Sequence, residues 1–185
     1  MNCINCNIKS CRNLEACKAQ NVDNELVLNE YLEEDTQQIV QVAAGLVDGG
    51  KAGEMSRLDE IVEFVNNMKY KKVGLAYCYG METEAGLLKS TLQKKGIHSI
   101  ISVSCTVGGL AQDEVNSKSC IHHVACNPIG QAKQLNSKKV DITITMGLCL
   151  GHDILLNKNI NSDLTTFVVK DRVFNHNPIE ALRNN

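Results

Sequence analysis

Nine cysteines are the residues of this 185-residue chain whose type and spacing most directly suggest chemistry. Four of them follow one another near the N-terminus in the pattern C-x2-C-x4-C-x5-C, as Cys3, Cys6, Cys11 and Cys17. Thiolates are soft ligands, and four of them satisfy either a tetrahedral Zn²⁺ ion or an iron–sulfur cluster. We therefore expect residues 1–22 to form a cysteine-rich metal-binding segment.

The spacing of these four cysteines favours a [4Fe–4S] cluster over zinc, and both remain open. Two-knuckle zinc sites usually separate their cysteine pairs by about a dozen residues or more, whereas these ligands are compressed. Compact zinc knuckles bind single-stranded RNA through aromatic side chains, and no aromatic residue precedes Tyr31. The bacterial ferredoxin run C-x2-C-x2-C-x3-C-P is not matched. Four ordinary reduced cysteines are disfavoured, because a segment so poor in large apolar residues has no core to bury them.

A second group of cysteines is expected where strands end. Three of them directly follow predicted strands and a fourth precedes an Asn-Pro helix start: Cys78, Cys105, Cys149 and Cys126. Parallel strands end at one edge of a sheet, which is where α/β sheets bind ligands. Four thiols there could hold a second cluster, bind another metal or act as a redox pair. The alternative is that they are small buried hydrophobic residues.

Polar residues follow the last two strands and are expected near the same edge: His152, Asp153, Lys170, Arg172 and His176. A histidine could be a metal ligand or a proton donor, and Lys170 with Arg172 could clamp an anionic substrate. These five residues are therefore candidate catalytic residues. In the simpler alternative, Asp153 caps a helix and the two basic residues are a solvated strand end.

The elements that would position these side chains alternate between strand and helix. Short apolar runs predict strands at 72–77, 97–103, 140–146 and 165–170. Helical periodicity spans about 24–47, Ser56 is typical of a helix N-cap, and Asn127-Pro128 is typical of another helix start. The prediction is an α/β fold, a Rossmann-like and mostly parallel four-stranded sheet with helices on both faces. We expect a helical linker at 23–55 and the α/β domain at 56–185.

Bulk properties narrow the classes of function. The net charge of −2 gives no electrostatic reason to expect nucleic acid, and no apolar run reaches the ~18 residues needed to span a bilayer. No signal-peptide-like stretch is present, so we expect the cytoplasm, where thiols stay reduced. Cysteines then indicate metal or redox chemistry rather than disulfides. No phosphate-binding glycine motif occurs. A small molecule or an electron-transfer protein is the expected partner, and the oligomeric state and enzymatic status are left open.

Several short motifs occur in the order found in one family. After the four N-terminal cysteines come LDEIVEFVNNMKYKKVGLAYCYGM, CTVGG, CNPIGQA, GLCLGHD and VVKDRVFNHNP. The chain thereby resembles the bacterial and archaeal domain-of-unknown-function family numbered eighteen-forty-seven, described as metal-binding proteins. The resemblance implies metal binding, draws attention to the same eight cysteines and supplies no reaction.

The resulting hypothesis is a cysteine-coordinated metalloprotein of the iron–sulfur type. It would carry one [4Fe–4S] cluster, or two if the strand-end cysteines bind a second, and the strand-end site would serve redox or metal-handling chemistry. A non-enzymatic protein with a structural zinc module is the first alternative, and a metal chaperone is the second.

Overall fold

The computed structural model describes residues 2–15, 17, 23–120 and 123–183. The chain divides into two units, Met1–Gly45 and Leu46–Asn185, and each is described by itself. Residues 18–22 of the predicted cysteine-rich segment lie outside the described residues. None of the described helices is long and apolar enough to cross a bilayer.

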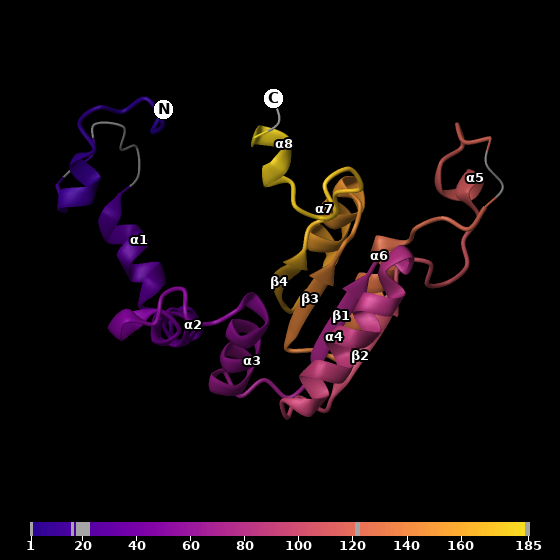
Figure 1. Ribbon diagram of the computed structural model, residues 1–185, viewed down its shortest axis with the longest axis horizontal. Coiled ribbons are helices and arrows are strands. Elements are labelled where there is room, and N and C mark those ends of the chain that lie inside the picture. Colours follow the sequence, from indigo (N-terminus) through magenta and orange to yellow (C-terminus); the bar gives the residue numbers. More distant parts are fainter. Residues whose placement is uncertain (1, 16, 18–22, 121–122, 184–185) are drawn as a thin grey trace. The chain divides into compact units, whose positions relative to one another are not determined.

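The second unit is built on a four-stranded sheet whose strands are all parallel (Figure 1). Its strands are β1 (Val73–Tyr77), β2 (Ile100–Ser104), β3 (Ile142–Met146) and β4 (Asp163–Val168). Their order across the sheet is β2-β1-β3-β4. The predicted α/β class and parallel sheet are therefore confirmed.

Several predicted strand boundaries differ from the structure, and two of these differences have a clear local reason. The strand expected at 97–103 begins only at Ile100, because Ile97 completes the end of the preceding helix and donates its N–H to the Leu92 carbonyl (3.0 Å). Gly96 permits this turn with a φ of 94°. The strand expected at 165–170 ends at Val168, whose carbonyl accepts from Gly147. Lys170 thus lies beyond the sheet.

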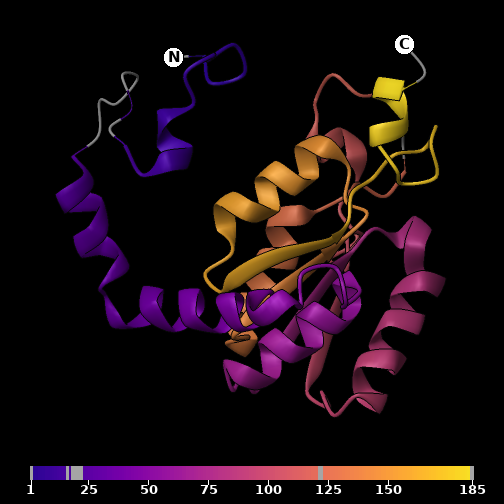
Figure 2. The ribbon, with the colours of Figure 1, turned by 60° about the vertical axis from the view of Figure 1, so that its left-hand side comes forward.

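Helices cover both faces of the sheet, with a separate apolar core on each (Figure 2). On one face, α3 (Arg57–Asn67) and α4 (Glu82–Lys94) bury residues such as Val65 and Leu92 with Ile144 of β3. On the other face, α6 (Pro128–Lys138) and α7 (Leu150–Asn159) bury Leu135 and Leu156. Burial on both faces explains why the strands read as nearly continuous apolar runs.

Helices α3 and α6 begin at the N-cap residues that the sequence predicts. The Ser56 hydroxyl accepts from the Asp59 N–H (3.2 Å) at the start of α3. Asn127 caps α6, with its Oδ1 accepting from the Gly130 N–H (2.8 Å). The other elements of the second unit are the 3-10 turns η2 (Asp48–Gly50) and η3 (Tyr79–Met81) and the short helices α5 (Gln112–Val115) and α8 (Ile179–Arg183).

The first unit contains the 3-10 turn η1 (Ser10–Asn13), α1 (Asn24–Tyr31) and α2 (Glu34–Gly45). The single helical stretch expected over 24–47 is therefore wrong. The helix ends after Tyr31, whose carbonyl accepts from the Gln37 side chain (2.5 Å), and the chain restarts as α2. Neither helix contains a buried residue.

Gly147 makes the turn by which the chain leaves β3. Its φ is 62°, a left-handed conformation that costs an L side chain free energy. A Cβ at this position would lie 2.0 Å from Met81 Sδ, so space is also lacking. Two residues later Cys149 occupies the N-cap of α7. The turn at Gly147 therefore determines where Cys149 lies at the carboxyl edge of the sheet.

We expect Gly147→Ala to lower the free energy of unfolding by roughly 1 to 3 kcal/mol, because the new methyl group meets both backbone strain and Met81. Urea denaturation followed by circular dichroism measures the change. Gly86→Ala is the matched control, since Gly86 lies inside α4 with open space at its Cβ position. Alanine should be neutral or stabilising there. Equal effects of the two substitutions would contradict the assignment.

Candidate thiol site at the carboxyl edge of the sheet

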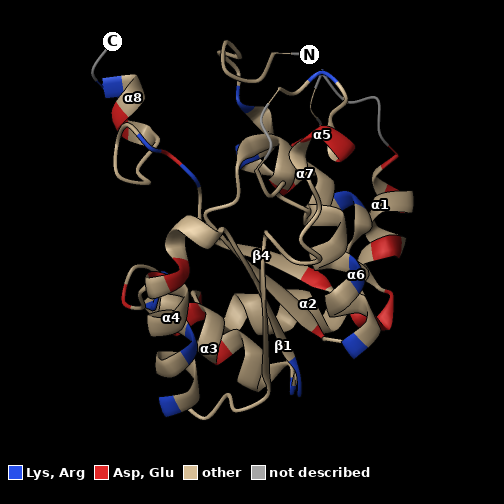
Figure 3. Cartoon of the chain, turned by 90° about the vertical axis from the view of Figure 1, so that its right-hand side faces the viewer, with Lys and Arg blue, Asp and Glu red and all other residues tan. Residues whose placement is uncertain are grey.

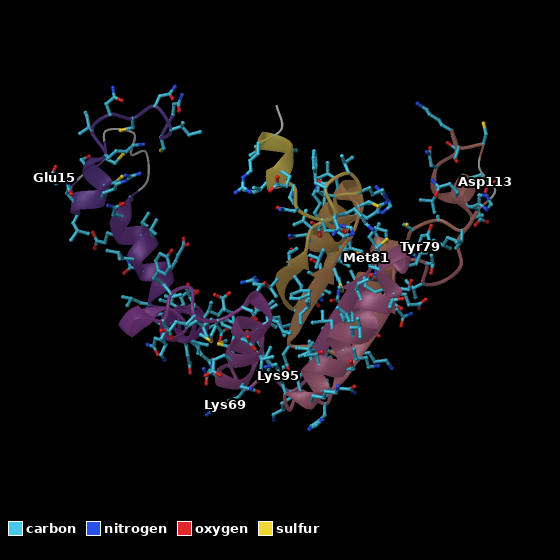
Figure 4. All side chains as sticks on the ribbon, viewed as in Figure 1. Glu15, Lys69, Tyr79, Met81, Lys95 and Asp113 are labelled. Atoms are coloured by element: carbon cyan, nitrogen blue, oxygen red, sulfur yellow. The ribbon has the colours of Figure 1, made fainter. Side chains whose placement is uncertain are left out.

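A pocket of about 530 Å³ lies beside the carboxyl ends of the strands in the second unit. From the end of β1 the chain proceeds to β2 on one side, while β3 pairs on the other side. Such a reversal of direction is where open α/β sheets bind ligands. Figure 4 labels Tyr79, which belongs to the pocket wall and directly follows Cys78.

Most of the predicted site residues line this pocket. Three of the four strand-end cysteines and four of the five polar candidates do so: Cys78, Cys126, Cys149, His152, Lys170, Arg172 and His176. Cys105 is not in the wall but is buried next to Cys126. Asp153 is the remaining polar candidate and does not line the pocket. It is not the helix cap either, because Cys149 holds that position and Asp153 lies within the first turn of α7.

Two of the pocket cysteines have a cationic partner. Lys170 Nζ donates to Cys78 Sγ (3.3 Å), and Arg172 Nη2 donates to Cys149 Sγ (3.0 Å). The contact with Cys149 raises the pKa of the Arg172 guanidinium above its ordinary value. A positive charge beside a sulfur favours the thiolate, which is the form that acts as a nucleophile or a metal ligand.

The other two cysteines face each other. Cys126 Sγ lies 3.6 Å from Cys105 Sγ, and the Tyr79 N–H also donates to Cys105 Sγ (3.3 Å). Burial raises the pKa of the Cys105 thiol to about 12, and Cys126 contributes further to the rise. Cys105 therefore keeps its proton at neutral pH.

A short turn after β4 orders the basic side of the pocket. Asp171 Oδ1 accepts from the N–H groups of Val173 and Phe174 (2.9 Å each), and the Asp171 N–H donates to His176 Nδ1 (3.1 Å). Basic and acidic positions alternate along the segment that leads from β4 toward α8 (Figure 3). Because Nδ1 is the acceptor, a neutral His176 carries its proton on Nε2.

The sequence argument missed Asp171 and Gln131. Gln131 is completely buried on α6, and its Nε2 donates to the carbonyls of Tyr77 (3.1 Å) and Val103 (2.8 Å). It thereby joins the carboxyl ends of β1 and β2. Its Oε1 has no hydrogen-bond partner within the described part of the chain. The sequence does place Gln131 beside the apolar positions Ala132 and Leu135, and this pattern could have indicated a buried glutamine.

The four N-terminal cysteines belong to the first unit and lie in an exposed segment. Cys3 and Cys11 are exposed, Cys6 and Cys17 are half-buried, and Ile4 and Leu14 are 91% and 100% exposed. Hydrogen bonds from the backbone N–H groups of Lys9 and Ile8 lower the pKa of Cys6. The donor types suit a soft metal or a cluster.

No mononuclear metal geometry is present in either cysteine group. Within residues 2–15, 17, 23–120 and 123–183, no three Cys, His, Asp or Glu side chains lie close enough together to hold a metal ion. In the pocket, each thiol instead has its own partner: a lysine, an arginine or another thiol.

His152 provides a pH-dependent reporter of the pocket. Burial, followed by the charge of Arg172, lowers the pKa of His152 below its ordinary value of 6.5. The imidazole should therefore stay neutral until the pH falls below that value. We expect an NMR titration to show this, and Arg172→Gln to move the pKa of His152 upward. Arg183→Gln is the control, because Arg183 pairs with Glu180 in α8. A His152 pKa above 6.5 in the unmodified protein would contradict the geometry.

Comparison with known proteins places the chain in a family. A family model described as "Protein of unknown function (DUF1847)" matches residues 15–167, which includes Cys17 and all four strand-end cysteines. An uncharacterized protein of Methanocaldococcus jannaschii is 39% identical over 185 residues, covering 98% of this chain and 93% of that protein. No solved structure matches significantly. The chain therefore belongs to the DUF1847 family.

Proposed function

We propose that this chain is a cysteine-coordinated metalloprotein in which Cys3, Cys6, Cys11 and Cys17 bind a [4Fe–4S] cluster and the sheet-edge pocket carries out thiol redox chemistry on a small molecule. One observation carries the proposal: all nine cysteines are free, and eight of them fall into two groups of four. One group lies in an exposed segment and the other gathers at a pocket on the ligand-binding edge of the sheet.

The absence of a core supports metal binding by the N-terminal segment. No residue of η1 is buried, and the backbone turns through left-handed conformations at Lys9 (φ 51°) and Leu14 (φ 61°) on either side of it. Apolar burial therefore contributes little toward the entropy cost of ordering these residues. In small metal-binding segments, the free energy of metal binding supplies that missing stability.

Iron–sulfur chemistry is favoured over zinc because an iron–sulfur cluster and the thiols of the pocket would both take part in redox chemistry. A bound cluster would supply one-electron transfer, for which zinc has no redox state. Thiols of the pocket can also be oxidised and reduced. Lys170 and Arg172 each bring a positive charge within 3.3 Å of one of these sulfurs.

Small-molecule redox chemistry suits the pocket better than metal handling does. Each of its thiols has a separate partner, which is a lysine, an arginine or another thiol. Its volume of about 530 Å³ lies within the ordinary range for small-molecule sites, roughly 300 to 1,000 Å³. Lys170 and Arg172 would bind an acidic group of the substrate, or stabilise negative charge on a leaving group.

Metal analysis tests the N-terminal half of the proposal. Protein purified without oxygen should be brown and contain about four irons and four acid-labile sulfides per chain. Cys3→Ser with Cys11→Ser should lose both, since two ligands are removed. Cys120→Ser is the matched control, because Cys120 is an exposed cysteine outside both groups.

Other metal contents would each point to a different protein. A colourless protein with about one zinc per chain would indicate the structural zinc module. Metal that a competing chelator removes quickly would indicate a metal chaperone. About eight irons would require the strand-end cysteines as ligands and would contradict the thiol chemistry proposed for the pocket.

Alkylation of Cys149 tests the pocket half. Arg172→Gln should slow the reaction of Cys149 with iodoacetamide several-fold at neutral pH, because the cation 3.0 Å from the sulfur is removed. The tryptic peptide 140–158 contains no other cysteine, so mass spectrometry follows this thiol alone. Arg183→Gln should leave the rate unchanged. Faster alkylation in Arg172→Gln would show that Arg172 only shields Cys149.

A further inference from the structure

Cys105 and Cys126 form a preorganised pair of thiols. Their sulfurs are 3.6 Å apart, so a disulfide of about 2.05 Å requires them to approach by only about 1.5 Å. The Asn127 N–H donates to the Cys105 carbonyl (2.6 Å), and the Cys105 N–H donates to the Tyr77 carbonyl (2.9 Å). These backbone bonds tie the start of α6 and the end of β1 to the same residue. The two cysteines are thus held together although they are far apart in the sequence.

The two thiols differ in access to the pocket. Cys126 is half-buried and lines the pocket, whereas Cys105 is 1% exposed and lies behind it. The raised pKa of Cys105 keeps its proton in place, and the Cys126 thiol donates a hydrogen bond to Cys105 Sγ (3.6 Å). Of this pair, Cys126 is therefore the sulfur that a small molecule in the pocket can reach, and Cys105 lies behind it.

We propose that Cys126 and Cys105 are the attacking and resolving thiols of a dithiol–disulfide couple that reduces a small hydroperoxide in the pocket. This inference deepens the thiol-redox half of the proposed function and does not depend on metal in the N-terminal segment. A small oxidant is favoured over a protein disulfide, because Cys126 lines a pocket whose volume of about 530 Å³ suits a small molecule. Lys170 and Arg172 line the same pocket and can stabilise the departing oxygen anion.

The chemistry balances with the hydroperoxide as the oxidant. The Cys126 thiolate attacks one peroxide oxygen, an S–O bond forms, the O–O bond breaks, and the departing hydroxide or alkoxide takes up a proton. Cys126 is then a sulfenic acid. Cys105 attacks Cys126 Sγ, the S–S bond forms, the S–O bond breaks, and the oxygen leaves as water with the Cys105 proton. Two thiols lose two electrons, which reduce the peroxide to water and an alcohol, or to two waters.

The backbone beside Cys105 supports its role as the second thiol. The Tyr79 N–H donates to Cys105 Sγ (3.3 Å), and this hydrogen bond lowers the pKa of Cys105 against the larger, opposite effect of burial. The same N–H can stabilise the Cys105 sulfur as it loses its proton in the attack on Cys126.

Peptide mapping of the full-length protein tests the couple. Trypsin separates Cys105, in peptide 96–118, from Cys126, in peptide 119–133, but the latter also contains Cys120. A Cys120→Ser background makes the assignment unique. The reduced protein is treated with one equivalent of hydrogen peroxide, remaining thiols are alkylated, and the two peptides are analysed by mass spectrometry. Iron is measured on the same sample beforehand, so that failure of the metal proposal is seen separately.

We expect the two peptides to become linked, with the loss of two free thiols per chain, and dithiothreitol to reverse the link. In Cys105→Ser, a sulfenic acid should accumulate on Cys126 and be trapped by dimedone. In Cys126→Ser, Cys105 should stay reduced. The parent protein alone suffices for the test if either variant fails to fold.

Two outcomes would overturn the couple. In the first, Cys105 and Cys126 stay reduced at a peroxide level that oxidises glutathione added to the same sample. In the second, the link forms no faster in folded protein than in protein unfolded by urea, which would mean that the fold does not prepare the pair. Either result would leave the two sulfurs as packing residues of the core around α6.

Discussion

The parallel pairing of β1 with β3 is the interaction on which the pocket depends. It continues one residue beyond the strand, because the Cys78 N–H donates to the Met146 carbonyl (3.1 Å). Cys78 and the turn at Gly147 therefore leave the sheet at the same level. The connections from β1 and β3 then diverge, and a crevice opens between them. If these two strands separated, the cysteines that follow them would no longer line the same pocket.

Within that crevice the sulfurs have different partners and so different chemistry. Lys170 and Arg172 stand beside Cys78 and Cys149, whereas Cys105 is buried against Cys126. Burying an anion is costly unless it is paired, so a thiolate belongs beside a cation and a proton belongs on the deeply buried sulfur. The pocket thus places two sulfurs beside cations, while the buried Cys105 sulfur behind its wall keeps its proton.

The two groups of cysteines also differ in what holds them. The pocket cysteines are positioned by strand ends, helix starts and two apolar cores, so their arrangement precedes any ligand. The N-terminal cysteines have no such support, since Ile4 and Leu14 remain almost entirely exposed. The fold itself therefore positions the pocket cysteines much more firmly than it positions the N-terminal ones.

The sequence by itself determined the fold class, the caps at Ser56 and Asn127, and the edge on which the cysteines lie, because these follow from local periodicity and the polarity of a parallel sheet. It did not determine where local signals compete: Ile97 reads as strand but ends a helix, and residues 24–47 break after Tyr31. Only the tertiary structure decided that Lys170 meets Cys78 and that Cys105 meets Cys126. Strand polarity brings residues to an edge, but crossover geometry and side-chain packing decide which of them touch.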